Sequence, residues 1–410
     1  MTEVIGIIGA NVAGGRAAQA LRKSGFEGEV HLFGTESHPP YDRPPLSKEV
    51  LLEHHQPEQA YLQPFEAWTD QRIDLHLNTT VTKIDPAART LETTTGDRLT
   101  VDKVLLTTGG RVRQLQVPGA DLSGVEYLRT IDDALAVRDR LRSRGHVVVV
   151  GGGFIGAEVA ACAKQAGCEV TLLEVEDVPL WRVLGRELGA IVTGFHRDEG
   201  VRVLTNTWLE RIEGTTEVTH VMTNRGERLE ASLVVIGIGV LPATELAVGA
   251  GIEVSNGVLV NEFGETSNPA VYAAGDVANH PNSIVGQRVR LEHWQNAQNQ
   301  GGAVGRAMVG LREEFREVPW FWSDQYDLAM QMSGHPHPDD QIVYRGDTAS
   351  RSFSAFFLRD GRLRSTFGVN RPRDVKRTMK YIESGQQLDA NQLSDESVDL
   401  RQLHTSGLAR

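Results

Sequence analysis

Two stretches of the chain repeat one pattern of apolar and polar positions. Residues 2–25 (TEVIGIIGANVAGGRAAQALRKSG) and 146–167 (HVVVVGGGFIGAEVAACAKQAG) each run from β-branched residues through a glycine cluster into a small-residue amphipathic segment that ends at glycine. A short apolar run bounded by glycine is typical of a buried strand, and the spacing that follows is typical of a helix. Each stretch therefore predicts a βα unit of a doubly wound α/β domain.

The second copy carries a complete dinucleotide-binding motif. Gly151, Gly153 and Gly156 form G-x-G-x-x-G between the valine run and the predicted helix, whose N-terminus attracts a pyrophosphate. The next strand, EVTLLE, ends in Glu174, about 20 residues on, where a carboxylate can bind an adenosine ribose. Glu176 follows closely, so a 2′-phosphate would meet like charge. We expect this site to prefer NADH.

The first copy departs from the motif at its middle position. Gly9 and Gly14 are kept, but Asn11 places a side chain where the backbone should approach a pyrophosphate. Asparagine tolerates the left-handed region, so the turn itself is retained. The strand EVHLFGTE then ends in Glu36, again about 20 residues after the glycines. Two such units predict two bound dinucleotides, and the alternative is two doubly wound domains with empty switch points.

Two further strand patterns favour a flavin at the first site. VLLTTGG (104–110) runs into glycine, and AVYAAGDVA (270–278) carries Asp276, whose carboxylate can bind ribityl hydroxyls. Both lie far from the first glycines, so we expect a discontinuous flavin domain with the NADH domain inserted into it. From Pro319 onward the pattern alternates around an Asp-Gly turn, which predicts an antiparallel sheet.

Composition narrows the class of protein. A formal net charge of −12 over 410 residues argues against nucleic acid as a partner. No run of 18 apolar residues and no signal-peptide pattern is present, so we expect no membrane association and a cytoplasmic location. Cys162 and Cys168 are expected to be reduced. No metal site is assigned, because His335 and His337 lie in a proline-rich loop that resembles a metal loop only loosely.

Short motifs in a fixed order carry a family resemblance. PYDRPPLSK, TTGGR, YLRT, VVVVGGGFIGAE, GIGVLP, AGDVA, LEHWQNAQNQG and VPWFWSDQYD follow one another along nearly the whole chain. The sequence thereby resembles the NADH-dependent, FAD-containing ferredoxin reductases of oxygenase systems. The resemblance implies an α/β fold class with two doubly wound dinucleotide-binding domains, glutathione-reductase-like, and a C-terminal α+β domain with an antiparallel sheet. The implied boundaries are 1–112 and 244–318 for the FAD-binding domain, 113–243 for the NADH-binding domain and 319–410 for the C-terminal domain.

The resemblance also implies site residues. Lys48 and Glu158 are expected to pair near the flavin and to act in catalysis; the alternatives are a solvated loop lysine and a carboxylate stabilised by the helix dipole. Three positions depart from the family pattern: Asn11 replaces the middle glycine, Thr107 stands where alanine is more common, and Glu36 stands where some members have aspartate. The expected FAD-binding positions are Gly9, Ala13, Gly14, Glu36, Arg43, Lys48, Val81, Arg129, Asp276 and Trp294. The expected NADH-binding positions are Gly151, Gly153, Ile155, Gly156, Glu158, Glu174 and Gly237.

The proline-rich segment 39–48 (PPYDRPPLSK) bears on the reaction. Its prolines exclude helix interior and central strand, which suits either a surface linker or a rigid cover over the flavin that presents Arg43 and Lys48. Related disulfide reductases carry a redox cysteine near this part of the chain, and this sequence carries none there, so electrons must leave the flavin directly. We therefore expect electrons to pass from NADH through FAD to a [2Fe-2S] ferredoxin that supplies a haem monooxygenase or Rieske-type oxygenase. The alternatives are an NADH oxidase, a quinone or dehydroascorbate-radical reductase on the same fold, or a flavin-based NADH sensor.

Overall fold

The computed structural model describes residues 2–403, which form two compact units. Unit 1 contains the chain up to Asp42, then Ala60–Arg111 and Leu241–Phe321. Unit 2 contains Arg43–Gln59, Val112–Val240 and the chain from Trp322 onward. Arg43, Ser47 and Lys48 of the proline-rich segment therefore belong to unit 2, which also carries the G-x-G-x-x-G motif. The three domain boundaries expected from the sequence stay a prediction.

A parallel sheet with the strand order β19-β7-β1-β2-β3 forms the centre of unit 1. Because β2 lies on one side of β1 and β7 on the other, the carboxyl end of β1 is a topological switch point, where open α/β sheets bind ligands. The elements of this layer are β1 (Val4–Ile8), α1 (Val12–Lys23), β2 (Glu29–Phe33), α2 (Glu66–Asp70), β3 (Ile73–His76), β7 (Lys103–Leu106), β19 (Val271–Ala273) and α7 (Trp294–Met308).

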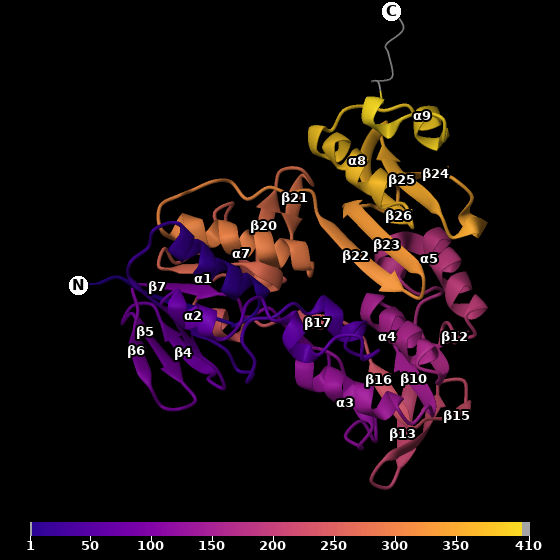
Figure 1. The fold of residues 1–410 in the computed structure, drawn as a ribbon, viewed down its shortest axis with the longest axis horizontal. Coiled ribbons are helices and arrows are strands. Elements are labelled where there is room, and N and C mark those ends of the chain that lie inside the picture. The colour runs from indigo at the N-terminus through magenta and orange to yellow at the C-terminus, as the bar shows by residue number, and fades with distance from the viewer. Residues whose placement is uncertain (1, 404–410) are drawn as a thin grey trace, which may run out of the picture. The chain divides into compact units, whose positions relative to one another are not determined.

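Helices α1 and α7 lie side by side in unit 1 (Figure 1). Small residues make this close approach possible: a Cβ added at Gly301 would lie 2.3 Å from the Ala13 carbonyl oxygen, and one at Gly305 would lie 2.7 Å from that of Ala17. Smaller sheets complete the unit. Their strands and the remaining helices are β4 (Val81–Asp85), β5 (Thr90–Thr93), β6 (Arg98–Thr100), α6 (Glu245–Gly249), β18 (Val258–Leu259), η3 (Gly275–Val277), β20 (Ala278–Asn282) and β21 (Gln287–Val289).

Unit 2 contains a second parallel sheet, with the order β12-β11-β10-β16-β9. The strand β10 again has neighbours on both sides, so its carboxyl end is a second switch point. The elements of this part are η1 (Pro44–Ser47), β9 (Val125–Tyr127), α3 (Ile131–Leu141), β10 (His146–Val150), α4 (Phe154–Gln165), β11 (Glu169–Leu173), α5 (Trp181–Asp198), β12 (Arg202–Leu204), β13 (Leu209–Gly214), β14 (Val218–Thr223), β15 (Arg228–Glu230) and β16 (Leu233–Ile236). The chain passes between the units within β8 (Gly110–Val112) and β17 (Val240–Pro242).

The C-terminal part of unit 2 is an antiparallel sheet, with the order β22-β23-β26-β25-β24, covered by α8. Asp360 and Gly361 both have positive φ, 52° and 68°, which is the type I′ geometry expected of an Asp-Gly hairpin. The predicted fold class, with two doubly wound sheets and an antiparallel C-terminal sheet, is confirmed. The elements are β22 (Trp320–Gln325), β23 (Leu328–Gly334), β24 (Gln341–Arg345), β25 (Phe353–Arg359), β26 (Arg362–Val369), α8 (Pro372–Ser384) and α9 (Ala390–Ser394).

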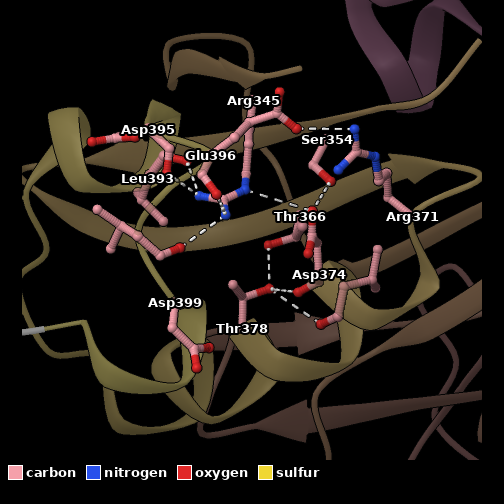
Figure 2. Close-up of polar contacts among 12 residues, drawn as sticks. Arg345, Ser354, Thr366, Arg371, Asp374, Thr378, Leu393, Asp395, Glu396 and Asp399 are labelled. Carbon is pink, nitrogen blue, oxygen red and sulfur yellow. Dashed lines mark hydrogen bonds and ion pairs between the residues drawn. The ribbon is translucent and has the colours of Figure 1, made fainter. Parts of the chain in front are cut away.

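A buried arginine anchors the last described segment to this sheet (Figure 2). The Arg345 guanidinium donates to the carbonyl oxygens of Leu393, Asp395, Glu396 and Val398 at 2.7–3.2 Å. Asp374 on α8 lies 3.8 Å from the Arg345 Nε and supplies a buried counter-charge. These four bonds tie residues 393–398 to β24, the strand that ends at the arginine. In the part of the chain that the structure describes, no helix has the length and apolar content needed to cross a membrane.

Candidate functional site

The glycine loop after β10 is shaped by contacts within unit 2. Gly151 has φ +100°, and a Cβ there would lie 2.4 Å from the Gly237 carbonyl oxygen. A Cβ at Gly156 would lie 2.0 Å from the Gly151 carbonyl oxygen. In contrast, a Cβ at Gly153, the N-cap of α4, meets nothing within 4 Å. The outer glycines thus allow strand and helix to approach each other, whereas Gly153 leaves open space at the helix N-terminus, where a pyrophosphate binds.

Glu174 lies beside this loop, at the carboxyl end of β11. Its buried carboxylate accepts hydrogen bonds from the backbone N–H groups of Gly152, at 2.7 Å, and Glu176, at 2.9 Å. These bonds fix the carboxylate against the glycine loop and keep it at the position from which a ribose hydroxyl is bound in such domains. Ile155, by contrast, is 46% exposed in the first turn of α4.

Lys48 and Glu158 are brought together in the interior of unit 2. The Lys48 Nζ lies 3.1 Å from the Glu158 Oε1 and donates to the Pro44 carbonyl oxygen at 3.1 Å. Glu158 is 3% exposed and Lys48 is 8% exposed, so the pair is largely removed from water. Burial raises the pKa of Glu158, while the Lys48 charge and hydrogen bonds from Ser323 and Ser47 act in the opposite direction.

Two serines complete the environment of Glu158. The Ser47 hydroxyl donates to Oε2, and the Ser323 hydroxyl donates to Oε1 at 2.6 Å. Ser323 in turn accepts from Gln325, at 3.0 Å, and Gln325 contacts His196 at 2.9 Å. The carboxylate is therefore held by hydrogen bonds from two separate segments in addition to its ion pair. A buried charge pair keeps one fixed geometry when its polar atoms all have hydrogen-bond partners, as they do here.

His196 ends this chain of contacts. It is fully buried on α5, with Gln325 on one ring nitrogen and the Tyr326 hydroxyl on the other, both at 2.9 Å. Burial lowers the pKa of His196 to about 4, so the imidazole is neutral at neutral pH. The His196 end of the polar network is therefore uncharged.

The first glycine loop follows β1 in unit 1. A Cβ at Gly9, which has φ +120°, would lie 2.2 Å from the Thr107 carbonyl oxygen, and one at Gly14 would lie 2.1 Å from the Gly9 carbonyl oxygen. Asn11 is the N-cap of α1: its side-chain oxygen accepts from the Gly14 N–H at 3.3 Å. Its amide nitrogen donates to the Thr107 carbonyl oxygen. The Asn11 side chain is therefore engaged in capping and in a bond to the neighbouring loop.

The acidic positions predicted in unit 1 lie after their strands. Glu36 follows β2 and accepts a hydrogen bond from the Tyr41 hydroxyl at 2.5 Å. Asp276 lies in η3, next to Gly275, where a Cβ would lie 2.9 Å from the Ala13 Cβ. Trp294 begins α7 and donates through its indole N–H to the Asp42 carboxylate.

The remaining positions divide between the units. Val81 is 4% exposed and packs in the hydrophobic core of unit 1 that also contains Phe33. Arg43 and Arg129 belong to unit 2, where Arg43 donates to the Arg129 carbonyl oxygen just before α3. Of the positions expected to bind FAD, those in unit 1 are Gly9, Ala13, Gly14, Glu36, Val81, Asp276 and Trp294, and those in unit 2 are Arg43, Lys48 and Arg129.

Sequence reasoning named Lys48 as a partner of Glu158 but missed its two serine partners. Ser47 lies within PPYDRPPLSK, and Ser323 lies within PWFWSDQYD, so both occur in motifs already quoted but were not singled out. The sequence gives little indication of their role, because a single serine beside charged or aromatic residues forms no recognisable pattern. His196 has no local signal, since it is an ordinary position on the buried face of α5.

Comparison with known proteins identifies the class. A family model described as pyridine nucleotide-disulphide oxidoreductase matches residues 4–301, and one described as reductase C-terminal matches residues 320–404. The chain therefore belongs to the pyridine nucleotide-disulphide oxidoreductase family, and within it to the ferredoxin reductases.

The individual relatives support this assignment over almost the whole chain. The chain is 39% identical to a ferredoxin–NAD(P)(+) reductase of a Sphingomonas species, covering 92% of each protein. It is 38% identical to rhodocoxin reductase of Rhodococcus erythropolis, covering 96% of this chain and 93% of the relative. Among solved structures, putidaredoxin reductase in its covalent complex with putidaredoxin superposes with a TM-score of 0.95 at 36% identity, covering 97% of each chain.

Proposed function

We propose that this chain is an NADH-dependent ferredoxin reductase that passes electrons through FAD to a [2Fe-2S] ferredoxin, which supplies a haem monooxygenase or Rieske-type oxygenase. When bound, FAD accepts two electrons as hydride and gives them up one at a time. The single observation that carries the proposal is the buried Lys48–Glu158 pair, 3.1 Å apart, in a chain whose cysteines are unsuited to redox exchange. Family membership and the relatives named above support it.

Neither cysteine of the chain is suited to relay electrons as a thiol. The Cys162 Sγ donates to the Ser47 carbonyl oxygen at 3.2 Å, and burial raises the pKa of this thiol to about 12. Cys168 donates to the Leu141 carbonyl oxygen at 3.6 Å, and burial also raises its pKa. Because the thiolate is the reactive form, both sulfurs are inert. Neither thiol would therefore relay electrons from a bound flavin.

The residues of both loops fit a dinucleotide. In unit 2, Gly153 leaves the N-terminus of α4 open while its neighbours close the strand–helix turn. In unit 1, the Asn11 amide nitrogen donates to the Thr107 carbonyl oxygen and its side-chain oxygen accepts from the Gly14 N–H, so this side chain is held against the turn. Glu36 and Asp276 supply carboxylates for ribose and ribityl hydroxyls. We therefore propose FAD for unit 1 and NADH for the loop of unit 2.

The buried pair positions the reacting groups in this proposal. Glu158 lies in the first turn and a half of α4, immediately after the glycine loop, and fixes the Lys48 ammonium by charge and geometry. Ser47 and Ser323 hold the carboxylate, so the lysine has one favoured position. A fixed ammonium beside the glycine loop of unit 2 can orient the approaching nicotinamide while contributing to the exclusion of water.

Preference for NADH rests on the carboxylates after β11. Glu174 and Glu176 would repel the 2′-phosphate of NADPH, whereas the Glu174 carboxylate can accept hydrogen bonds from the ribose of NADH. We also propose a cytoplasmic location, supported by the two buried thiols, which suit a reducing compartment.

The test is NADH-driven cytochrome c reduction by the FAD-loaded protein, with and without a [2Fe-2S] ferredoxin of an oxygenase system. A large ferredoxin-dependent rise is expected. If ferricyanide or a quinone is reduced quickly and ferredoxin adds nothing, the oxidase or quinone-reductase alternative replaces this proposal. Slow reduction followed by a long-lived complex with NAD⁺ and no productive acceptor would instead favour an NADH sensor.

A further inference from the structure

Three potential metal ligands meet at one edge of the sheet in unit 1. The parallel register of β2 and β3 sets His31 opposite Asp74 and Phe33 opposite His76. Because side chains alternate along a strand, His31, Asp74 and His76 point to the same face of the sheet. Their ligand atoms all lie within 4.8 Å of one another. His76 is the last residue of β3, and the three side chains lie on one face of the β2–β3 edge, outside the glycine loop that follows β1.

The distances among these atoms match a tetrahedral ion. The His31 Nδ1 lies 3.1 Å from the His76 Nε2 and 3.2 Å from the Asp74 Oδ2, and the His76 Nε2 lies 3.3 Å from the same Oδ2. A zinc ion with nitrogen and oxygen ligands at about 2.0–2.1 Å in tetrahedral geometry holds its ligand atoms about 3.3 Å apart. All three edges of the triangle therefore have the length that one shared cation requires.

Protons alone do not satisfy this triangle. If only one imidazole nitrogen carries a proton, the contact between the other nitrogen and the carboxylate has no hydrogen bond. If both nitrogens carry protons that point to Asp74, the contact between His31 and His76 has none. Each proton arrangement thus leaves one of the three contacts unsatisfied, whereas a cation at the centre of the triangle satisfies all three.

The surroundings orient the rings as they are oriented in metal sites. The His76 ring stacks on Phe33, with centroids 4.6 Å apart and planes 12° apart. The His31 Nε2 faces the Glu29 carboxylate at 3.4 Å, which is the contact by which a carboxylate fixes the tautomer of a ligating histidine.

The site is also accessible. The Asp74 side chain is 62% exposed and that of His76 is 33% exposed, so an ion can enter and keep water at its fourth position. We propose that His31 Nδ1, His76 Nε2 and Asp74 Oδ2 form a site for a divalent transition metal of the zinc class. Bound metal links the edge strand β3 to β2 and stabilises unit 1. This inference does not depend on the proposed electron-transfer function.

The test is calorimetric titration of the FAD-loaded protein with ZnCl₂, after treatment with a chelator and desalting. Wild type is expected to bind one equivalent at this site, and His76→Asn and His31→Asn are expected to bind it at least tenfold more weakly. Asp74→Asn is expected to weaken it by a similar factor. Glu29→Gln, which removes only the orienting charge, is expected to weaken binding by about tenfold.

Matched controls separate this site from general binding to surface histidines. His54→Asn/His55→Asn changes two adjacent histidines of unit 2 and is expected to keep the wild-type isotherm. Thermal unfolding provides the second readout: zinc is expected to raise the Tm of wild type and of this control, and not that of His76→Asn. Calcium, which prefers oxygen ligands, is expected to give no shift. An unchanged isotherm in both His31→Asn and His76→Asn, with flavin absorbance intact, would overturn the proposal.

Discussion

The two glycine loops show which parts of one motif serve the protein and which serve the ligand. Both loops keep the outer glycines, and in both a Cβ would meet a carbonyl oxygen at 2.0–2.4 Å. They differ in the middle, where unit 1 has Asn11 and unit 2 has Gly153. Asn11 caps α1 with its side chain, whereas Gly153 caps α4 without one. Packing thus requires glycine at the outer positions of the motif, whereas the middle position can be either asparagine or glycine.

A second difference lies two residues after the last glycine of each motif. Unit 1 has Arg16 at this position, and its guanidinium bonds to Gln19 on the same helix at 3.0 Å. Unit 2 has Glu158, which is buried and paired with Lys48. The same helical position therefore stabilises a partly buried helix surface in one copy and forms the centre of a polar network in the other. Repetition of the motif does not imply repetition of its chemistry.

The largest effect is expected when one of the outer glycines, which both loops share, is replaced. Gly156→Ala places a Cβ 2.0 Å from a backbone oxygen that cannot move without opening the turn. We expect it to destabilise the protein by about 3 kcal/mol, at the upper end of overpacking costs. Urea unfolding followed by circular dichroism measures this loss. Gly153→Ala is the control, because its Cβ meets nothing, and a similar loss of stability there would contradict the comparison.

The second largest effect is expected when the Glu174 carboxylate beside the glycine loop of unit 2 is removed. Glu174→Ala is expected to weaken NADH use by roughly tenfold to a hundredfold, since a charged hydrogen bond contributes about 1.5 to 3 kcal/mol. The KM for NADH in ferricyanide reduction measures it. The Glu174 carboxylate also holds the Gly152 N–H, so Glu174→Gln serves as a control that keeps an acceptor oxygen. Equal use of NADPH and NADH by the native protein would contradict the proposed preference.

A smaller effect is expected from the position that distinguishes the two helices. Glu158→Gln keeps the size of the side chain and one of its two acceptor oxygens, but it leaves Lys48 without its counter-charge. We expect flavin reduction by NADH to slow by about tenfold, or about 1.4 kcal/mol in the barrier, with little unfolding. Stopped-flow absorbance measures the rate. A rate equal to that of wild type would remove Glu158 from the mechanism.

The smallest expected effect concerns the cap of α1. Asn11→Ala removes the side-chain acceptor for the Gly14 N–H and is expected to cost about 1 kcal/mol of stability, while Asn11→Gly is expected to cost only a few tenths. Urea midpoints of the FAD-loaded proteins measure both. If Asn11→Gly destabilised the protein as much as Asn11→Ala, the contact with Thr107, and not the cap, would be the stabilising interaction.

The fold could be predicted because its signals are local. Strand, glycine and helix follow one another within about 25 residues in each βα unit, and the Asp360–Gly361 turn needs only two residues to set its backbone. The role of Asn11 could not be predicted. From sequence it is a side chain in the path of a phosphate, and only the structure shows that its amide turns onto the Thr107 carbonyl oxygen.

The candidate sites were less accessible to sequence reasoning because their members come from distant segments. Ser47, Glu158 and Ser323 are separated by more than a hundred residues from one another and meet only in the folded unit. The triangle of His31, Asp74 and His76 likewise depends on the register of two strands, which no spacing within either strand reveals. Contacts between residues far apart in the sequence can be predicted only after the order and register of the strands are known.

The way Arg345 holds the C-terminal segment has a consequence for how that segment can vary. Its four acceptors are carbonyl oxygens, which every amino acid supplies. Solvent-facing positions such as Asp395 and Glu396 can therefore change identity without loss of these four bonds, provided that the backbone path is kept. An anchor of this kind constrains the length and the backbone conformation of the C-terminal segment. It does not constrain the identity of the side chains there, so these can differ between homologous proteins.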